Sequence, residues 1–212
     1  AYLQVSMADR VGVIDYGGGN LQNVLNVLKY LNHEGMLVSS PEGFSNIDRL
    51  IFPGVGSFGD CVADLDRKDL RQPILEWLQA DRPFFGICLG YQVLFEQSEE
   101  TPGVEGLGFF TGSVIKFDGG HGLKIPHMGW NEVTFRNHEL LNNISQNTDF
   151  YFVHSYYFRT QKNENCIATT KYPNPITAAV LKENIFGTQF HPEKSHNNGK
   201  QIITNFLEWE PS

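Results

Sequence analysis

The first half of the chain alternates short apolar runs rich in β-formers with amphipathic segments, and this alternation constrains the fold more than any other feature. The apolar runs lie at residues 11–16, 36–39, 50–52 and 84–88. Strand and helix units of this length predict a central, mostly parallel sheet with right-handed crossovers and helices on both faces. In such α/β sheets, sites form at the carboxyl ends of the strands, so the strand-to-helix junctions are the first places to search.

The helices are predicted from the spacing of apolar residues. After Gly17-Gly18-Gly19, one apolar stripe recurs at helical spacing and consists of Leu21, Val24, Leu25, Leu28 and Leu31. Residues 58–80 are expected to be helical with a break near Pro73. The strand at 84–88 is expected to lead into a helix at 89–97.

The second half is rich in β-formers separated by turn residues. The expected strands are 114–117, 132–135, 151–158, 166–172 and 177–190, the last with a hairpin turn at Lys182-Glu183-Asn184. A closing amphipathic helix is expected at 199–209. Since no linker or repeat divides the chain, we expect one α/β domain over residues 7–212, with antiparallel strands added in its C-terminal half. Residues 1–6 are expected to be a tag remnant or the residue of a trimmed leader.

Composition and charge narrow the classes of function. The net charge of −8 and the absence of a Lys/Arg cluster argue against a nucleic-acid partner. No apolar run approaches the roughly 20 residues of a membrane-spanning helix, so no membrane partner is expected. Cys61, Cys88 and Cys166 form no CxxC pair and belong to no cluster with zinc spacing. We therefore expect free thiols in a reducing compartment, by default the cytoplasm, and no bound metal.

A candidate nucleophile lies at the fourth strand-to-helix junction, in Gly86-Ile87-Cys88-Leu89-Gly90. This is the cysteine counterpart of the G-x-S-x-G nucleophile elbow, in which a sharp turn leaves no room for side chains two residues either side of the nucleophile. The turn exposes the thiol, and N–H groups at the start of the helix favour the thiolate. A buried structural cysteine in a glycine-flanked turn is the alternative. Cys61 and Cys166 lack such a setting.

A nucleophilic cysteine needs a base, and the base needs an orienting group. His191 follows the run at 185–190, where a strand end would bring it to the active edge, and it begins His191-Pro192-Glu193. A carboxylate two residues on can turn back to hold the imidazole, which then takes the thiol proton and returns it to a leaving amine. An ordinary surface turn is the alternative.

A third element, Pro53-Gly54-Val55-Gly56, directly follows the third strand. Its glycines allow the backbone to direct an N–H group into a cleft. Together with the N–H of Leu89, such a donor would form an oxyanion hole for a tetrahedral intermediate. Gly17-Gly18-Gly19 matches neither G-x-G-x-x-G nor a P-loop, so no nucleotide cofactor is expected.

Together, Gly86-Ile87-Cys88-Leu89-Gly90-Tyr91-Gln92 and Gln189-Phe190-His191-Pro192-Glu193-Lys194-Ser195 resemble the class I (triad) glutamine amidotransferases, which have a flavodoxin-like sheet. Within that class, three further segments resemble the glutaminase subunits of imidazole glycerol phosphate synthases, which act in histidine biosynthesis. They are residues 53–56, Pro126-His127-Met128-Gly129-Trp130-Asn131 and Tyr151-Phe152-Val153-His154-Ser155-Tyr156. The resemblance spans about residues 10–209.

The resemblance implies a role for each matching residue. Cys88 is then the nucleophile, His191 the general base and acid, and Glu193 its partner, while the backbone N–H groups of Val55 and Leu89 are the oxyanion donors. The glutamine α-amino and α-carboxylate groups are then held by Gly56, Gln92, Glu100, Ser155 and Tyr156. The residues that then face the partner protein are Asn20, Trp130, Tyr151 and Lys194.

The resemblance also implies the reaction and the partner. Glutamine is hydrolysed to glutamate and ammonia through a cysteine thioester, without a cofactor. Ammonia passes to a (β/α)8 cyclase bound as a heterodimer, which forms imidazole glycerol phosphate. Three alternatives stay open from the sequence: a paralogous glutaminase serving another synthase, such as one that amidates a surface sugar; a cysteine peptidase or DJ-1-like hydrolase; and a non-catalytic scaffold.

Overall fold

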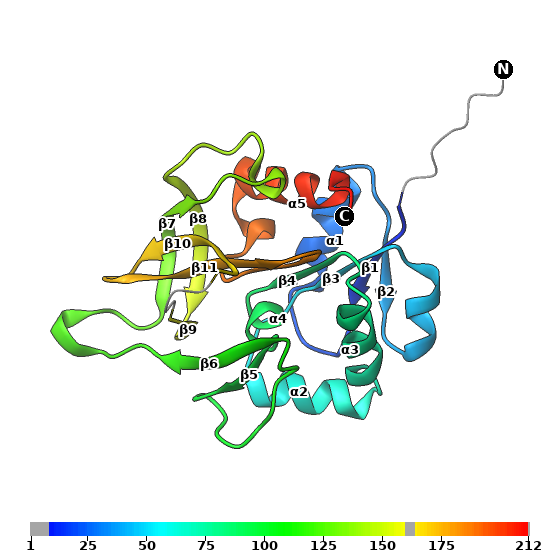
Figure 1. Ribbon diagram of the computed structural model, residues 1–212, viewed down its shortest axis with the longest axis horizontal. Coiled ribbons are helices and arrows are strands. Elements are labelled where there is room, and N and C mark those ends of the chain that lie inside the picture. The colour runs from blue at the N-terminus through cyan, green and yellow to red at the C-terminus, as the bar shows by residue number, and fades with distance from the viewer. Residues whose placement is uncertain (1–8, 160–163, 212) are drawn as a thin grey trace.

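A nine-stranded sheet forms the centre of the computed structural model, which describes residues 9–159 and 164–211 (Figure 1). The strand order is β2-β1-β3-β4-β12-β11-β10-β7-β8. Residues 1–6, expected to be a tag remnant or leader, lie outside the described residues. The predicted α/β class, with a parallel half and an added antiparallel half, is confirmed.

The parallel half of the sheet is built from the strands predicted first. These are β1 (Val11–Ile14), β2 (Gly35–Val38), β3 (Arg49–Phe52), β4 (Phe84–Ile87) and, from the far end of the chain, β12 (Ile185–Thr188). Neighbouring strands within this group of five pair in parallel. Because β12 lies beside β4, residues about a hundred positions apart in sequence leave the sheet at the same edge.

The antiparallel half continues from β12 through the predicted hairpin, whose turn joins Lys182 to Ile185. Its strands are β11 (Pro175–Lys182), β10 (Cys166–Lys171), β7 (His127–Phe135) and β8 (Thr148–His154). The strand expected at 151–158 is interrupted at Ser155, after which β9 (Tyr156–Phe158) joins a second sheet. That three-stranded sheet also contains β5 (Phe95–Ser98) and β6 (Phe110–Lys116).

Helices cover both faces of the parallel half (Figure 1). The helices are α1 (Leu21–Tyr30), α2 (Phe58–Arg67), α3 (Arg71–Gln79), α4 (Leu89–Gln92) and α5 (His196–Glu208). One apolar cluster joins α1 and α5 to the face that carries Ile51 and Phe85, and the other joins α2 and α3 to the face that carries Phe52 and Phe84. Alternate residues of each strand thus fill two separate cores.

The helix expected at 89–97 is only one turn long, and this prediction was wrong. Phe95 instead begins β5 and packs on Phe110 and Phe158. The carbonyl groups of residues 93–96 accept hydrogen bonds from the N–H groups of residues 106–110, so they do not bond to a following helical turn. A short apolar run fits a buried strand and a buried helix equally well, so its periodicity could not reveal this tertiary pairing.

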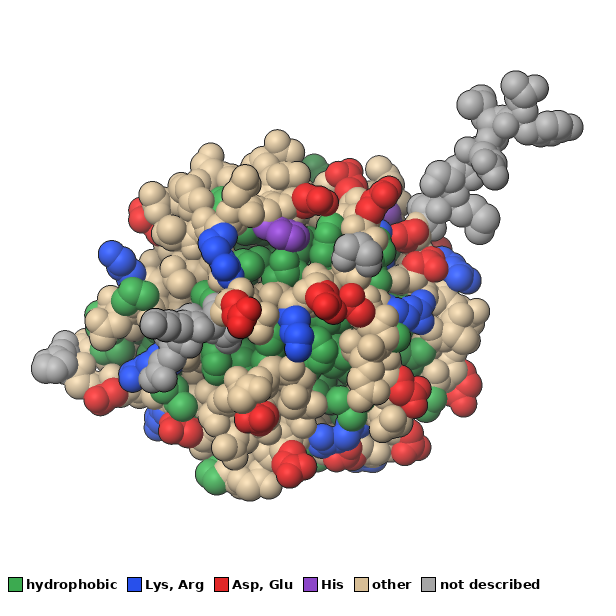
Figure 2. All heavy atoms as spheres, viewed as in Figure 1, with side chains coloured by type: hydrophobic (Ala, Val, Ile, Leu, Met, Phe, Trp, Pro, Cys, Tyr) green, Lys and Arg blue, Asp and Glu red, His purple; other side chains and the backbone are tan. Residues whose placement is uncertain are grey.

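The surface carries charges of both signs. Acidic and basic side chains are interspersed over the face shown in Figure 2. In the part of the chain that the structure describes, no helix is long and apolar enough to cross a membrane.

The break in the helical region 58–80 falls at residues 68–70, where Asp69 has a positive φ of 55°. Pro73 lies within the first turn of α3.

The close contact between Gly106 and the 93–96 segment gives a stability prediction. A Cβ atom on Gly106 would lie 2.1 Å from the carbonyl oxygen of Phe95 and 2.9 Å from the ring of Phe58. Gly106→Ala should therefore lower the free energy of unfolding by about 2 kcal/mol or more, measured by urea denaturation.

Gly119→Ala is the matched control. The nearest atom to a Cβ there is Cδ1 of Ile125 at 3.6 Å, an ordinary contact. This variant should change the free energy of unfolding by less than about 1 kcal/mol. Equal effects of the two substitutions would contradict the close packing of residues 106–110 on residues 93–96.

Candidate functional site

The backbone at Cys88 makes the sharp turn that the glycine pattern predicts. Cys88 lies between β4 and α4 with φ 53° and ψ −104°, a conformation that costs a non-glycine residue about 1–3 kcal/mol. A Cβ atom on Gly86 would lie 2.6 Å from the carbonyl oxygen of Gly90, and one on Gly90 would lie 1.8 Å from that of Phe52. Both glycines are therefore required by close backbone contacts.

The thiol of Cys88 opens onto a cavity of about 540 Å³. The cavity lining contains every residue expected to bind glutamine and both expected oxyanion donors, and it adds two residues of β8. The lining is Val55, Gly56, Cys88, Leu89, Gln92, Glu100, Val153, His154, Ser155 and Tyr156. The structure thus brings the predicted substrate-binding residues together around the thiol, while their binding roles stay predictions.

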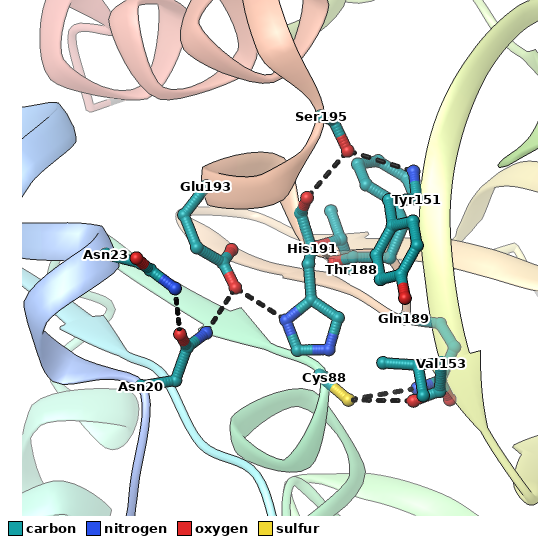
Figure 3. A network of polar contacts seen from close by, with 11 residues as sticks. Asn20, Asn23, Cys88, Tyr151, Val153, Thr188, Gln189, His191, Glu193 and Ser195 are labelled. Atoms are coloured by element: carbon teal, nitrogen blue, oxygen red, sulfur yellow. Dashed lines mark hydrogen bonds and ion pairs between the residues drawn. The ribbon is translucent and has the colours of Figure 1, made fainter. Parts of the chain in front are cut away.

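His191 and Glu193 form a buried pair beside Cys88 (Figure 3). The Nδ1 atom of His191 lies 2.5 Å from Oε1 of Glu193, and both side chains are fully buried. The His191 backbone N–H donates to the carbonyl of Tyr151 on β8, which fixes the residue after β12. The Nε2 atom of His191 has no hydrogen-bond partner and is available for proton transfer.

The charges around His191 favour its protonated form. Burial lowers the pKa of the imidazole, but negative charge on the Cys88 thiolate and on Glu193 outweighs burial and raises the pKa to about 10. Asn20 adds a further contact, since its side-chain amide donates to Oε1 of Glu193 at 2.6 Å. The carboxylate is therefore held by two partners on different segments and keeps the imidazole in one orientation.

One of the two expected oxyanion donors is engaged within the chain. The backbone N–H of Leu89 donates to the carbonyl oxygen of Gly54 at 3.3 Å. Gly56, which follows Val55, has a positive φ of 114°, and a Cβ added there would meet no atom within 4 Å. The segment at residues 53–56 thus supplies the carbonyl that occupies the Leu89 N–H, and its last glycine is surrounded by open space.

Two of the residues expected to bind glutamine, Glu100 and Gln92, already form hydrogen bonds within the chain. Oε1 of Glu100 accepts the backbone N–H of Phe58 at the start of α2, at 3.1 Å. Burial, with the nearby Asp60, raises the pKa of Glu100, against the lowering effect of the Phe58 N–H. The Nε2 atom of Gln92 donates to the carbonyl of Tyr156 and to Oε1 of Gln189, both at 3.1 Å.

The residues expected to face a partner lie on neighbouring strands and turns. Trp130, on β7, is 47% exposed and packs against Tyr151 with ring centroids 6.0 Å apart. The Trp130 ring also stacks on the His196 ring, with centroids 5.0 Å apart. Lys194 is half-buried in the short helix Pro192–Lys194, which contains Glu193. Their place in an interface stays a prediction.

Sequence reasoning missed Gln189 and the buried pair His127 and His154. Gln189 is fully buried and donates to Sγ of Cys88 at 3.7 Å (Figure 3). The Nδ1 atom of His127 lies 2.8 Å from Nε2 of His154. Gln189 begins the motif that contains His191, but the motif alone assigns no contact to its side chain. The two histidines meet because β7 and β8 pair in register.

The hydrogen bonds around the histidine pair fix both tautomers. Nδ1 of His154 must donate to the carbonyl of Tyr156 at 2.8 Å, which leaves its Nε2 as an acceptor. His127 therefore donates from Nδ1, and its Nε2 accepts from the side-chain amide of Asn131 at 3.0 Å. Burial lowers the pKa of His127 to about 4 and that of His154 to about 3, so both rings are neutral.

The arrangement of a cysteine elbow, a buried His–Glu pair and a doubly wound sheet defines the triad amidotransferase class. The family model described as glutamine amidotransferase class-I matches residues 12–209, so the chain belongs to this family. The resemblance inferred from the motifs is confirmed, and so is the prediction of an enzyme of this type.

Matches to individual proteins are more specific than the match to the family model. The chain is similar to the imidazole glycerol phosphate synthase subunit HisH of Chromobacterium violaceum, with 45% identity over 210 residues that cover 95% of this chain and 98% of the relative. The protein of the same name from Neisseria meningitidis serogroup A is 44% identical and covers 94% and 100%.

Solved structures match in fold. A structure described as PurLQS from Thermotoga maritima has a TM-score of 0.74, with 20% identity, covering 95% of this chain and 98% of that chain. One described as a glutamine amidotransferase has a TM-score of 0.73, with 19% identity, covering 93% and 97%.

The histidine pair gives a prediction about protonation. In ¹⁵N-detected spectra of the side chains, His127 and His154 should both show the neutral tautomer with hydrogen on Nδ1, from pH 8 down to about pH 5. An ordinary histidine with a pKa near 6.5 is mostly protonated at pH 5. A cationic signal from either ring at pH 5, or the tautomer with hydrogen on Nε2, would contradict the chain of hydrogen bonds.

Proposed function

We propose that this chain is the glutaminase subunit of an imidazole glycerol phosphate synthase and supplies ammonia to a cyclase partner in histidine biosynthesis. The observation that carries the proposal is the Cys88 thiol, which lines the 540 Å³ cavity and lies beside His191, whose Nε2 has no hydrogen-bond partner (Figure 3). The relatives at 44–45% identity over nearly the whole chain bear the name of that subunit. The cytoplasm is the proposed compartment, in keeping with three cysteines that form no disulfide with one another.

The proposed reaction proceeds in two steps through the thioester. The Cys88 thiolate attacks the side-chain carbon of glutamine, and protonated His191 gives its proton to the departing ammonia. Water then attacks the thioester while His191 takes its proton, and the thiolate leaves with the electrons of the broken C–S bond. Glu193 and Asn20 hold the imidazole in place during both transfers.

Recognition of glutamine would use the residues that line the cavity with Cys88. The Glu100 carboxylate suits the α-ammonium group, while N–H groups of the turn at Gly56 and of Ser155 suit the α-carboxylate. Gln92 uses its amide hydrogens on Tyr156 and Gln189, so its oxygen is the atom left for the ligand. These assignments remain proposals for Gly56, Gln92, Glu100, Ser155 and Tyr156.

The oxyanion hole is proposed to form only when the partner is bound. The N–H of Leu89 is now engaged by the carbonyl of Gly54, and the glycines at 54 and 56 would tolerate a peptide flip that releases it and turns the N–H of Val55 inward. A subunit that hydrolyses glutamine only in the complex would not waste it.

The chain needs a bound partner enzyme that accepts ammonia directly, because free ammonia is mostly protonated and unreactive in neutral water. We propose that a (β/α)8 cyclase binds as a heterodimer over the surface at Asn20, Trp130, Tyr151 and Lys194. The contact of Asn20 with Glu193, and that of Tyr151 with the backbone of His191, connect this surface directly to the triad. A different synthase is the alternative partner, and co-purification from the source cell distinguishes the two.

The central prediction concerns Cys88. In the complex with the cyclase, Cys88→Ala should lower glutamine hydrolysis by roughly 10⁴-fold or more, because loss of a triad nucleophile removes covalent catalysis. Turnover is measured as glutamate released. A glutamine-analogue electrophile should also label wild-type Cys88 in a 1:1 ratio, and glutamine should block the labelling.

Cys166→Ala is the matched control and should keep near wild-type turnover, because Cys166 lies on β10, outside the cavity. Retention of glutamine hydrolysis by Cys88→Ala would refute the proposal. Labelling without protection by glutamine would favour a hydrolase of the DJ-1 type.

A second prediction concerns the partner. Glutamine turnover by the isolated chain should rise by about 10²-fold or more when the cyclase and its ligand are added, since one missing oxyanion donor typically costs about 10²–10³ in rate. Equal rates with and without the partner would show that the segment at residues 53–56 needs no rearrangement.

A further inference from the structure

Gln189 is a buried side chain in contact with the reacting sulfur for which the proposed reaction so far has no role. It follows β12, one strand away from the elbow, and is fully buried. Its Nε2 atom lies 3.7 Å from Sγ of Cys88, within hydrogen-bonding distance of sulfur, and its Oε1 accepts from Gln92 at 3.1 Å. Its amide therefore bridges the nucleophile and a residue of the cavity wall.

The carbonyl of Tyr156, at the far end of this bridge, determines which atoms donate and which accept. The carbonyl of Tyr156 can only accept, so the Gln92 side chain must turn its amide nitrogen toward it. The same nitrogen then donates to Gln189, whose oxygen must face it. This leaves the Gln189 N–H directed at Cys88. Reversal of the Gln189 amide would place two donors against each other.

We propose that Gln189 is a further catalytic residue, whose amide N–H holds the Cys88 thiolate before attack and receives it again when the thioester breaks. The proposal rests on the proposed glutaminase function. In the second step water forms the new C–O bond and gives its proton to His191, while the C–S electrons return to sulfur. The Gln189 N–H then stabilises that leaving group.

Other sources of stabilisation at the sulfur are few. Helix α4 has four residues, so its dipole is small, and the Leu89 N–H is directed at Gly54. Among the described residues that line the cavity, the charged one is Glu100, whose sign opposes a thiolate.

The other titratable groups near Cys88 lie on three elements. His191 and Glu193 follow β12, and His154 on β8 is neutral because burial lowers its pKa to about 3. Tyr16, after β1, is also neutral, since burial and nearby negative charge raise its pKa. The Val153 carbonyl oxygen, 4.0 Å from Sγ, can accept from the thiol but does not favour a thiolate. Of the groups named here from the described residues, His191 and the amide of Gln189 therefore favour a negative sulfur.

The test is the pH dependence of Cys88 alkylation by iodoacetamide, followed by mass spectrometry of the Cys88 peptide. Gln189→Met keeps the side-chain volume and removes the donor. We expect its alkylation midpoint to rise by about one pH unit or more, and its rate near neutral pH to fall about tenfold, as expected for loss of a hydrogen bond to a charged acceptor. An unchanged midpoint would overturn the proposal, even if glutamine turnover fell, because it would indicate a purely structural role.

Thr188→Val is the matched control. Thr188 is also fully buried at the same strand end, and its hydroxyl donates to the carbonyl of Phe190, so the substitution loosens the segment without removing a donor to sulfur. Its midpoint should match the wild type. An equal shift in both variants would overturn the proposal.

A measurement on the unaltered protein covers the case in which Gln189→Met does not fold. With ¹⁵N-labelled glutamine residues, one side-chain amide signal should shift with the same midpoint as Cys88 alkylation, and the shift should vanish in Cys88→Ala. No amide signal following that midpoint would overturn the proposal. Neither readout requires glutamine hydrolysis, so failure here is distinct from turnover by Cys88→Ala, which would refute the proposed function.

Discussion

The close approach of Gly90 to the end of β3 is the constraint on which the site depends. The space at Gly90 allows no Cβ, since one would lie 1.8 Å from the carbonyl oxygen of Phe52. This contact presses the elbow against the sheet and holds Cys88 at a positive φ. The packing of two apolar cores on opposite faces of the sheet supplies the stability that maintains this strained turn.

Two runs of hydrogen bonds meet at the carbonyl of Tyr156 and together connect the elbow with β7. From one side, the side chains of Asn131, His127 and His154 donate in turn toward the carbonyl of Tyr156. From the other, Gln92 donates to the same carbonyl and to Gln189. Because Asn131 is next to Trp130 on β7, these hydrogen bonds end on the strand that carries part of the surface proposed to receive the cyclase.

The sequence alone predicts the site where a short motif also determines the local backbone geometry. The glycines around Cys88 and the strand that ends before His191 follow from rules about backbone space and strand ends. The prediction of a helix at 89–97 was wrong, because the apolar residues 93–95 fit both a helix and a strand. Only their hydrogen bonds to residues 106–110 make this segment extended. Gln189 was missed for a similar reason: its contact with Gln92 spans 97 positions and depends on how β4 and β12 align.

The claim that glutamine is cleaved at Cys88 is tested most directly by trapping the acyl group. The complex is mixed with ¹³C-labelled glutamine, quenched in acid within one turnover, and mapped by peptide mass spectrometry. The account predicts one labelled glutamyl group on the peptide that contains Cys88. Label on the peptide of Cys61 or Cys166, or glutamate formed in the same sample with no labelled peptide, would contradict it.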